Sequence, residues 1–478
     1  MYYNLLRLVL VSMNKNSSIL KSIFALAIPI IMANLFQAMY QLTDSFWVGR
    51  LGGAALAAVS ICTPIIFLAV SVGIGFAIAG STFVAQYFGA KDHKMVSHAA
   101  AQTILMIIFI SLIFSILGLI FSPQILHFLG ANSEIFSMAL AFLRVSFISL
   151  IANFCFFIFQ SIMRGIGKPT IPVYIVIVTV LLNFILDPLF IFGFGPISPM
   201  GPSGAAFATL ITQIIATTTG FIILFGGKHG IHLKFSDFKP DFKFIKKSFL
   251  IGLPSSIEQS SRNLAMTVMI SLIAGFGTTA MASYGAGSNI IQVAMMAAIG
   301  LAVANGTLVG QSIGAKDIKR ASQISQLTSI IGFVSLSIIG LIAFIFSRQF
   351  ISFFVPNDQS VIAEASRFVR SVSLTFGFIA LQMSFGNIFA AAGKTSVTMT
   401  LTIVSQWLFQ LPLVYFLSKH TSLGIHGIWL AFPITNIITA IIGFVLYSRG
   451  SWKDGRIIED NKLIGQVEEE TLVEEGIH

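Results

Sequence analysis

Long apolar stretches alternate with short polar ones along the whole chain. Each apolar stretch holds about 20 residues or more, the length that an α-helix needs to cross a hydrocarbon core of about 30 Å. Such uniform apolarity does not fit the alternating strands of a membrane β-barrel. The pattern predicts twelve spanning helices, over residues 22–48, 54–86, 99–121, 136–160, 170–193, 204–226, 247–274, 280–304, 322–346, 363–390, 396–418 and 424–447.

Composition also indicates an all-α polytopic membrane protein. Hydrophobic residues make up 56% of the 478 residues and charged residues only 10%, whereas soluble proteins carry about 25%. The net charge of +10 does not indicate nucleic acid, because Lys and Arg gather in alternate connections, as at 91–94, 228–247 and 316–320. This is the positive-inside pattern. It predicts a multi-pass protein of the cytoplasmic (inner) cell membrane, with both termini cytoplasmic and no nucleic-acid partner.

The sequence repeats itself at a shift of about 225 positions. STFVAQYFGAKDHKMVSHA at 81–99 aligns with GTLVGQSIGAKDIKRASQI at 306–324, and Pro29 aligns with Pro254. Each half holds six spans, so both halves insert in the same orientation and form two lobes related by a parallel pseudo-twofold axis. We expect a cytoplasmic N-terminal segment at 1–21, an N-terminal lobe at 22–226, a cytoplasmic connector at 227–246, a C-terminal lobe at 247–447 and a solvated cytoplasmic tail at 448–478. Translation from Met1 or from Met13 fits the sequence equally well.

Two acids lie deep in predicted spans: Asp44 in the first and Asp187 in the fifth. A charge at such depth costs about 2.5–3.5 kcal/mol on insertion scales and normally faces a water-filled or protein-lined cavity. The aligned positions in the second half are Met269 and Leu413, so the repeated scaffold does not need these acids to fold. The aspartates therefore indicate a transporter coupled to an ion.

Polar residues accompany both aspartates. Tyr40 precedes Asp44 by four residues and Asn183 precedes Asp187 by four, which places each pair on one helix face. Thr209 in the sixth span can add a hydroxyl. Carboxylate, amide and hydroxyl oxygens suit a small hard cation, so Asp44, Asn183, Asp187 and Thr209 form a possible Na⁺ site. The same two carboxylates would instead hold a proton, because burial and mutual repulsion disfavour two ionised acids. The residues leave Na⁺ or H⁺, and the stoichiometry, open; no cofactor is expected.

Other polar positions have structural alternatives. Asp44 could pair with Arg50 at the membrane surface, although a separation of six residues places the two on different helix faces. In the seventh span Glu258 and Arg262 have the favourable i,i+4 order of a helical ion pair, which is either structural or part of a polar cavity. We expect the substrate cavity to be lined by Gln37, Glu258, Gln259 and Arg262. Pro29 should bend the first span and so provide a hinge, or be a static kink.

The motifs TDSFWVGRLG at 43–52, the two GAKD sequences, RGIGKPT at 164–170 and NFILDPLFIFG at 183–193 resemble those of the multidrug and toxic compound extrusion (MATE) family over residues 18–447. The resemblance implies a twelve-helix antiporter that exports cationic or amphipathic compounds in exchange for Na⁺ or H⁺. It matches Asp44, Asn183 and Asp187 to the amino-lobe cation site, with Tyr40 and Thr209 as neighbours and Pro29 at the bend of the first helix. Because LTFGFIALQMSFGNIFAA at 374–391 contains no acid, the chain resembles the DinF-like branch.

The sequence therefore predicts a secondary antiporter rather than an enzyme, with no phosphate-binding GxxxxGK[ST] loop for ATP hydrolysis. Its partners would be membrane lipid and small cationic or amphipathic molecules, and we expect a monomer. The two lobes would rock around the neutralised aspartates. The alternative is a lipid-linked oligosaccharide flippase of the same superfamily, which should line its cavity with basic groups; Arg262 is the clear candidate. The substrate and the resting conformation cannot be read from the sequence.

Overall fold

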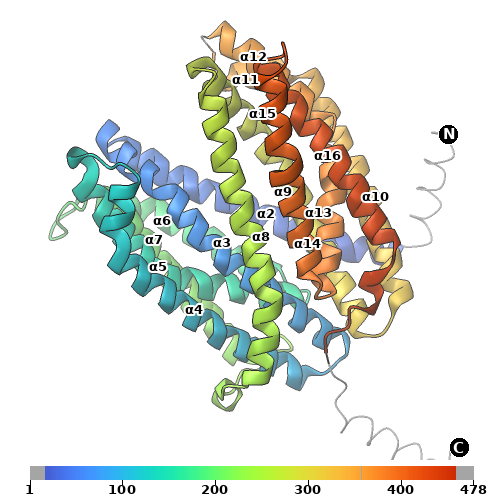
Figure 1. Ribbon diagram of the computed structural model, residues 1–478. Helices are drawn as coiled ribbons and strands as arrows, with labels where there is room; N and C mark the ends of the chain where they lie inside the picture. Colours follow the sequence, from blue (N-terminus) through green and yellow to red (C-terminus); the bar gives the residue numbers. More distant parts are fainter. Residues whose placement is uncertain (1–16, 357, 459–478) are drawn as a thin grey trace, which may run out of the picture.

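The computed structural model describes residues 17–356 and 358–458, most of them helical (Figure 1). The first half contains α2 (Ser17–Gly49), α3 (Gly53–Gly89), α4 (His93–Phe128), α5 (Ser133–Gly165), α6 (Thr170–Phe192) and α7 (Pro202–Phe225). The second half contains η1 (Phe235–Phe238), α8 (Phe242–Ala274), α9 (Thr278–Gly314), α10 (Ile318–Ile345), α11 (Ser347–Phe354), α12 (Gln359–Ser373), α13 (Phe376–Ala391), α14 (Thr395–Ile403), η2 (Val404–Gln410), α15 (Leu411–Lys419), α16 (Ile425–Ser448) and η3 (Ser451–Asp454). Within the described residues the extended structure is limited to one isolated bridge, which confirms the all-α prediction.

Each predicted span corresponds to a helix or to a broken helix. In the described part of the chain, ten helical segments are long and apolar enough to cross a membrane, and the bent pair α12–α13 makes eleven. The twelfth span is α8, which is 33 residues long. Its hydropathy is low because Glu258, Arg262 and several serines and amides interrupt its apolar residues.

Two spans of the C-terminal lobe are irregular where their N-terminal counterparts are continuous. The axis bends by 51° between α12 and α13, at a point where α5 runs on without a break. Asn436 of α16 donates a hydrogen bond to the Thr375 hydroxyl at this break (3.0 Å). Between α14 and α15 the chain forms a short π-helix, η2. A wider turn of this kind is often found at functional positions in helices.

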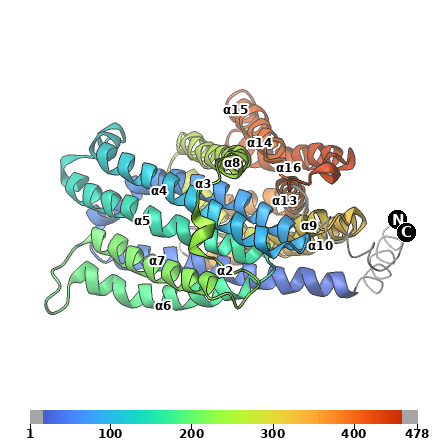
Figure 2. The ribbon, with the colours of Figure 1, turned by 90° about the horizontal axis from the view of Figure 1, so that it is seen from below.

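The helices form two lobes, α2–α7 and α8–α16, that diverge toward the top of Figure 1 and meet toward its base; Figure 2 shows them from below. Each lobe has its own hydrophobic core. The N-terminal part of each leading helix packs in the opposite lobe. Ile23 and Ala27 of α2 lie in the core of the second lobe, and Phe244 and Ile251 of α8 lie in the core of the first. Helix α2 also packs along α9, and α3 along α8. The repeat found in the sequence is therefore a structural repeat.

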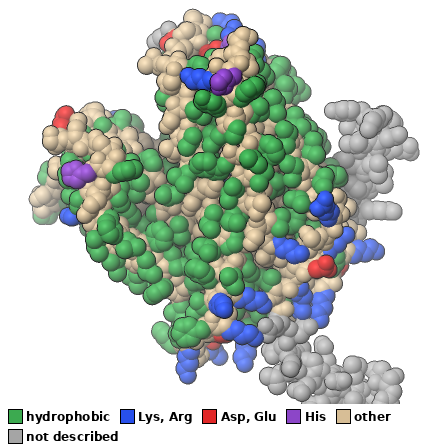
Figure 3. Space-filling view, viewed as in Figure 1, with side chains coloured by type: hydrophobic (Ala, Val, Ile, Leu, Met, Phe, Trp, Pro, Cys, Tyr) green, Lys and Arg blue, Asp and Glu red, His purple; other side chains and the backbone are tan. Residues whose placement is uncertain are grey.

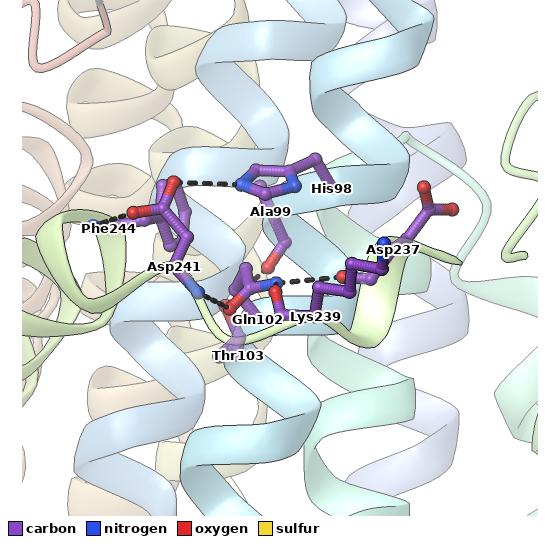
Figure 4. Close-up of polar contacts among 8 residues, drawn as sticks. All are labelled: His98, Ala99, Gln102, Thr103, Asp237, Lys239, Asp241 and Phe244. Atoms are coloured by element: carbon purple, nitrogen blue, oxygen red, sulfur yellow. Dashed lines mark hydrogen bonds and ion pairs between the residues drawn. The ribbon is translucent and has the colours of Figure 1, made fainter. Parts of the chain in front are cut away.

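The predicted connector is docked on the start of α4 (Figure 4). The fully buried side chain of Gln102 donates to the backbone carbonyls of Asp237 and Lys239, at 2.7 Å each, and accepts from the amide of Asp241 at 2.9 Å. His98 Nε2 lies 3.2 Å from a carboxylate oxygen of Asp241. One buried glutamine thus holds the loop between the lobes against the N-terminal lobe.

Candidate functional site

The two aspartates lie on neighbouring helices at the same depth. Asp44 lies five residues before the last residue of α2, and Asp187 lies five residues before the last residue of α6. These two helices pack side by side. Helix α7 starts where α6 has ended and runs back beside it, so Thr209, seven residues into α7, reaches the same level. The structure therefore brings the predicted residues of the cation site together.

Each carboxylate accepts a hydrogen bond from a different neighbour. Asn183 Nδ2 donates to Asp187 Oδ1 at 3.0 Å, within one turn of α6. Thr209 Oγ1 donates to Asp44 Oδ2 at 3.4 Å, across from α7 to α2. Asn183 and Asp187 are fully buried, whereas Asp44 is half-buried. The two carboxyl groups lie near each other, and no hydrogen bond joins them.

Three oxygens of this cluster lack a donor. Asp44 Oδ1, Asn183 Oδ1 and Asp187 Oδ2 are each buried with no hydrogen-bond partner among the described residues. Within the same residues neither aspartate forms an ion pair with Lys, Arg or His. Arg50, the alternative partner of Asp44, stacks instead on the rings of Phe46 and Trp47. A buried acceptor without a donor costs about 1–3 kcal/mol, so the cluster is suited to a cation or a proton.

The donor set limits which ions fit. Residues 17–356 and 358–458 contain no group of three or more His, Cys, Asp or Glu residues that could hold a metal. The cluster offers two carboxylates, one amide oxygen and the hydroxyl of Thr209. These are hard oxygen ligands with a low total charge. Such a set fits a monovalent cation better than a tightly held divalent metal.

Thr212, which lies beside the site and holds Tyr40, was not identified from the sequence. Its hydroxyl is hydrogen-bonded to that of Tyr40, and both side chains are buried. Tyr40 is thereby joined to α7 rather than directly to a carboxylate. The signal was present in the sequence, because Thr212 follows Thr209 by three residues and shares its helix face.

The expected cavity residues on α8 form a separate cluster. Arg262 donates to Glu258 Oε1 at 3.0 Å, and Thr402 of α14 donates to the same oxygen at 3.2 Å. Gln259 is half-buried beside this pair, and Gln37 is half-buried on α2, seven residues before Asp44. The Glu258–Arg262 pair is thus neutralised within the C-terminal lobe, outside the aspartate cluster.

A fourth acid lies within a predicted span and was not identified from the sequence. Glu364 lies near the start of α12, within the predicted tenth span. Its carboxylate accepts from Trp429 Nε1 at 2.6 Å and lies 3.4 Å from Arg367 and 3.3 Å from His426. These partners anchor α12 to α16. Unlike the two aspartates, this acid is fully engaged by its neighbours.

The predicted hinge lies in an unbroken helix. Helix α2 continues through Pro29 from Ser17 to Gly49. Gly300 of α9 packs against the backbone carbonyl of Ala27 and the side chain of Ile31, on either side of the proline. The proline therefore lies where α2 contacts the other lobe, and its role as a hinge stays a prediction.

A known protein family and known relatives match both lobes of the chain. The MatE family model matches residues 29–189 and 254–416, one match in each lobe. The probable multidrug resistance protein YoeA of Bacillus subtilis is 26% identical, over 92% of this chain and 96% of that protein. The multidrug export protein MepA of Staphylococcus saprophyticus is 27% identical, over 76% and 79% of the two chains.

Solved structures share the fold. A structure described as MATE in complex with MaL6 has a TM-score of 0.85 at 23% identity, covering 92% of this chain and 97% of that one. An outward-facing multidrug resistance MATE transporter of the MOP superfamily has a TM-score of 0.84 at 23% identity and the same coverage. At this identity the likeness shows the fold alone. The family model, which matches more than half of the chain, establishes that the chain belongs to the MatE (multidrug and toxic compound extrusion) family of membrane transporters.

Proposed function

We propose that this protein exports small cationic or amphipathic compounds, drugs among them, in exchange for Na⁺ or H⁺. Proteins named for multidrug resistance or export match it over most of its length. The observation that carries the proposal is the set of three buried oxygens without donors on Asp44, Asn183 and Asp187. A coupling ion would supply the positive charge that this cluster lacks.

The cluster can load either ion. A sodium ion between the helices would take oxygens from both carboxylates, from Asn183 and from the hydroxyl of Thr209. A proton would instead turn one carboxyl into a donor to the other. In both cases the negative charge of the pair falls, and the cost of keeping two acids in an apolar lobe falls with it.

Helix α2 would carry the change to the lobe interface. It packs on α6 in its own lobe and on α9 in the other. Pro29 removes the helical hydrogen bond that would otherwise reach the Ala25 carbonyl, so α2 can bend there at low cost. A bend would move the Ala27 and Ile31 surface against Gly300. This would reshape the cavity, displace the exported compound and let the lobes rock.

The charged surface supports an orientation. Lys and Arg side chains gather at the lower end of the molecule in Figure 3. We assign this end to the cytoplasm, together with both chain termini, in the inner cell membrane. Apolar side chains such as Phe109, Ile116 and Ile120 of α4 are exposed on the sides, where lipid would cover them. We propose a monomer as the working unit. The flippase alternative is less well supported, because Arg262 is already paired with Glu258.

Efflux from proteoliposomes tests the proposal. Export of a fluorescent organic cation is measured under an imposed Na⁺ gradient and, separately, under an imposed pH gradient. The wild type should respond to at least one gradient. Asp44→Asn and Asp187→Asn should each remove that dependence, because an amide cannot bind or release a proton and holds Na⁺ weakly.

The matched control is Asp358→Asn. Asp358 is an exposed N-cap of α12 that accepts from the amides of Ser360 and Val361, and asparagine caps a helix equally well. The control should keep full gradient-driven efflux. Full coupling in both Asp44→Asn and Asp187→Asn would overturn the assignment of the site.

A further inference from the structure

The lobes meet backbone to backbone at the C-terminal ends of α3 and α9. A Cβ added at Gly89 would overlap the carbonyl oxygen of Gln311, and one added at Gly314 would overlap the carbonyl oxygen of Gln86. The two contacts are equivalent under the repeat. Neither helix can carry a side chain here without moving away, so the glycine of each GAKD sequence marks where the lobes touch.

The glutamines beside these glycines bind across the interface. Gln86 is fully buried and donates to the carbonyl of Ala391 at the end of α13 (2.8 Å). Gln311 is half-buried and donates to the carbonyl of Gly165 at the end of α5 (2.8 Å). Thr82 adds a bond to the carbonyl of Ala390 at 3.1 Å. Each lobe thus donates hydrogen bonds to the C-terminal end of a helix in the other lobe.

Gln86 has two further bonds that Gln311 lacks in the described chain. Its Nε2 also donates to the carbonyl of Gly455 at 3.0 Å, and its Oε1 accepts from the amide of Ile457 at 2.9 Å. We call residues 455–458 the strap. It follows α16 and η3 of the C-terminal lobe, yet Ile458 packs in the hydrophobic core of the N-terminal lobe.

The strap is also enclosed by the C-terminal lobe. A Cβ on Gly455 would overlap Ala392, and one on Gly393 would overlap the side chain of Ile457. Trp452, just before the strap, is buried and stacks on Tyr447 of α16. The strap therefore runs from one lobe into the other and closes over the end of Gln86. The prediction of a solvated tail is therefore wrong for residues 451–458, because Trp452 and Ile458 are buried.

We propose that the strap and Gln86 form a latch that holds the two lobes together at the cytoplasmic end and has to open before the transporter can face inward. The inference rests on the proposed alternating-access function. Gln86 loses its strap bonds if the lobes separate, since Gly455 and Ile457 are fixed to the C-terminal lobe on one side and Gln86 is fixed to α3 on the other. The latch is present at Gln86 and not at Gln311, although the two glutamines are otherwise equivalent in the contact between the lobes.

Two truncations separate the strap from the chain beyond it. One variant ends at residue 454 and lacks the strap, and its matched control ends at residue 458 and keeps it. Spin labels are placed at Lys94 and Lys319, exposed and equivalent positions at the starts of α4 and α10. Cys62 and Cys155, both buried, are changed to Ala. Distance distributions are measured in lipid nanodiscs.

The chain ending at 458 should give the distribution of the full chain, dominated by the short distance. The chain ending at 454 and Gln86→Leu should each raise the long-distance population by about fivefold or more, the effect of losing one or two neutral hydrogen bonds. Gln311→Leu, which removes a single cross-lobe hydrogen bond, should raise the long-distance population less. If the chain ending at 454 fails to fold, the distance distribution of Gln86→Leu alone tests the latch.

Equal distributions for Gln86→Leu, the shorter truncation and the full chain would overturn the latch. The distance measurement does not depend on export. A failure of ion-coupled efflux would therefore refute the proposed function and leave the latch untouched. An unchanged distance distribution in Gln86→Leu would refute the latch even if efflux is fully coupled.

Discussion

Thr209 and Thr212 lie one turn apart on α7 and bind different side chains of α2. Thr209 donates to the carboxylate of Asp44, and Thr212 is hydrogen-bonded to the hydroxyl of Tyr40. Thr212 also lies within donor distance of the backbone carbonyls of Ala208 and Thr209. A threonine hydroxyl has a single proton; when that proton is given to the backbone, Tyr40 is the donor to Thr212. One threonine thus belongs to the ion cluster and the other to the helix packing below it.

Thr209→Val should weaken ion coupling without abolishing it. The substitution keeps the shape of the side chain and removes one long hydrogen bond to Asp44 as well as a hydroxyl ligand. We expect the concentration of the coupling ion at half-maximal efflux to rise by about fivefold, which corresponds to the loss of about 1 kcal/mol from one hydrogen bond. Thr218→Val, at an exposed position of the same helix, is the control and should leave it unchanged. An unaltered ion dependence in Thr209→Val would exclude the hydroxyl from the site.

The Tyr40–Thr212 pair should contribute to stability. Thr212→Val leaves the buried hydroxyl of Tyr40 without its partner, Tyr40→Phe removes the hydroxyl that binds Thr212, and the double variant removes both groups. We expect a coupling of about 1 kcal/mol between the two sites in a double-mutant cycle, measured by denaturant unfolding of the protein in detergent micelles. Strictly additive effects would show that the contact contributes nothing. Ion-coupled efflux should persist in Tyr40→Phe, because the tyrosine does not contact a carboxylate directly.

Much of the fold could be predicted because membrane spans have a strong local signal. The apolar pattern predicted all twelve segments, α8 among them, although the polar residues of α8 lower its hydropathy below that of the other spans. The first and last residues of the helices were less predictable. Helix α8 starts at Phe242, inside the predicted connector, because Asp241 caps it by accepting from the amide of Phe244.

The candidate site was predictable for the same reason, since charge in an apolar span is conspicuous. Asp44, Asn183, Asp187 and Thr209 all reach one cluster. The strap was not predictable. Its contacts join Gln86 to Gly455 and Ile457, more than 360 residues apart, and a four-residue segment has no periodicity from which to infer burial. Residues 1–16 and 459–478 of the predicted termini lie outside the described residues.

The connector should detach from α4 in acid. The backbone amide of Phe244 and the neighbouring His98 hold the pKa of Asp241 below its ordinary value. The folded form therefore binds this proton less readily than the unfolded form. The resulting stabilisation is present above the unfolded pKa of about 3.9 and is lost as the pH falls through the lower folded pKa.

Hydrogen exchange of residues 227–241 measures this docking. Protection of the segment should fall at a pH below about 4 in the wild type. Asp241→Asn keeps the helix cap but carries no charge, so protection should be weaker at neutral pH and should lose its dependence on this carboxylate. The same acid-induced loss in Asp241→Asn and in the wild type would assign it to another group.

Alanine at Gly89 or Gly314 should separate the lobes, whereas alanine at Gly285 should not. In the first two positions the new methyl group meets a backbone carbonyl of the other lobe, which cannot rotate away. Gly285 lies on α9 with Gly314, but a Cβ there meets no other described atom within 4 Å, so Gly285→Ala should stabilise the helix by about 0.5–1 kcal/mol. The Lys94–Lys319 spin-label distance should lengthen in Gly89→Ala and Gly314→Ala and stay unchanged in Gly285→Ala. Because the two contacts are equivalent under the repeat, a shift in one glycine variant but not in the other would contradict a shared backbone contact.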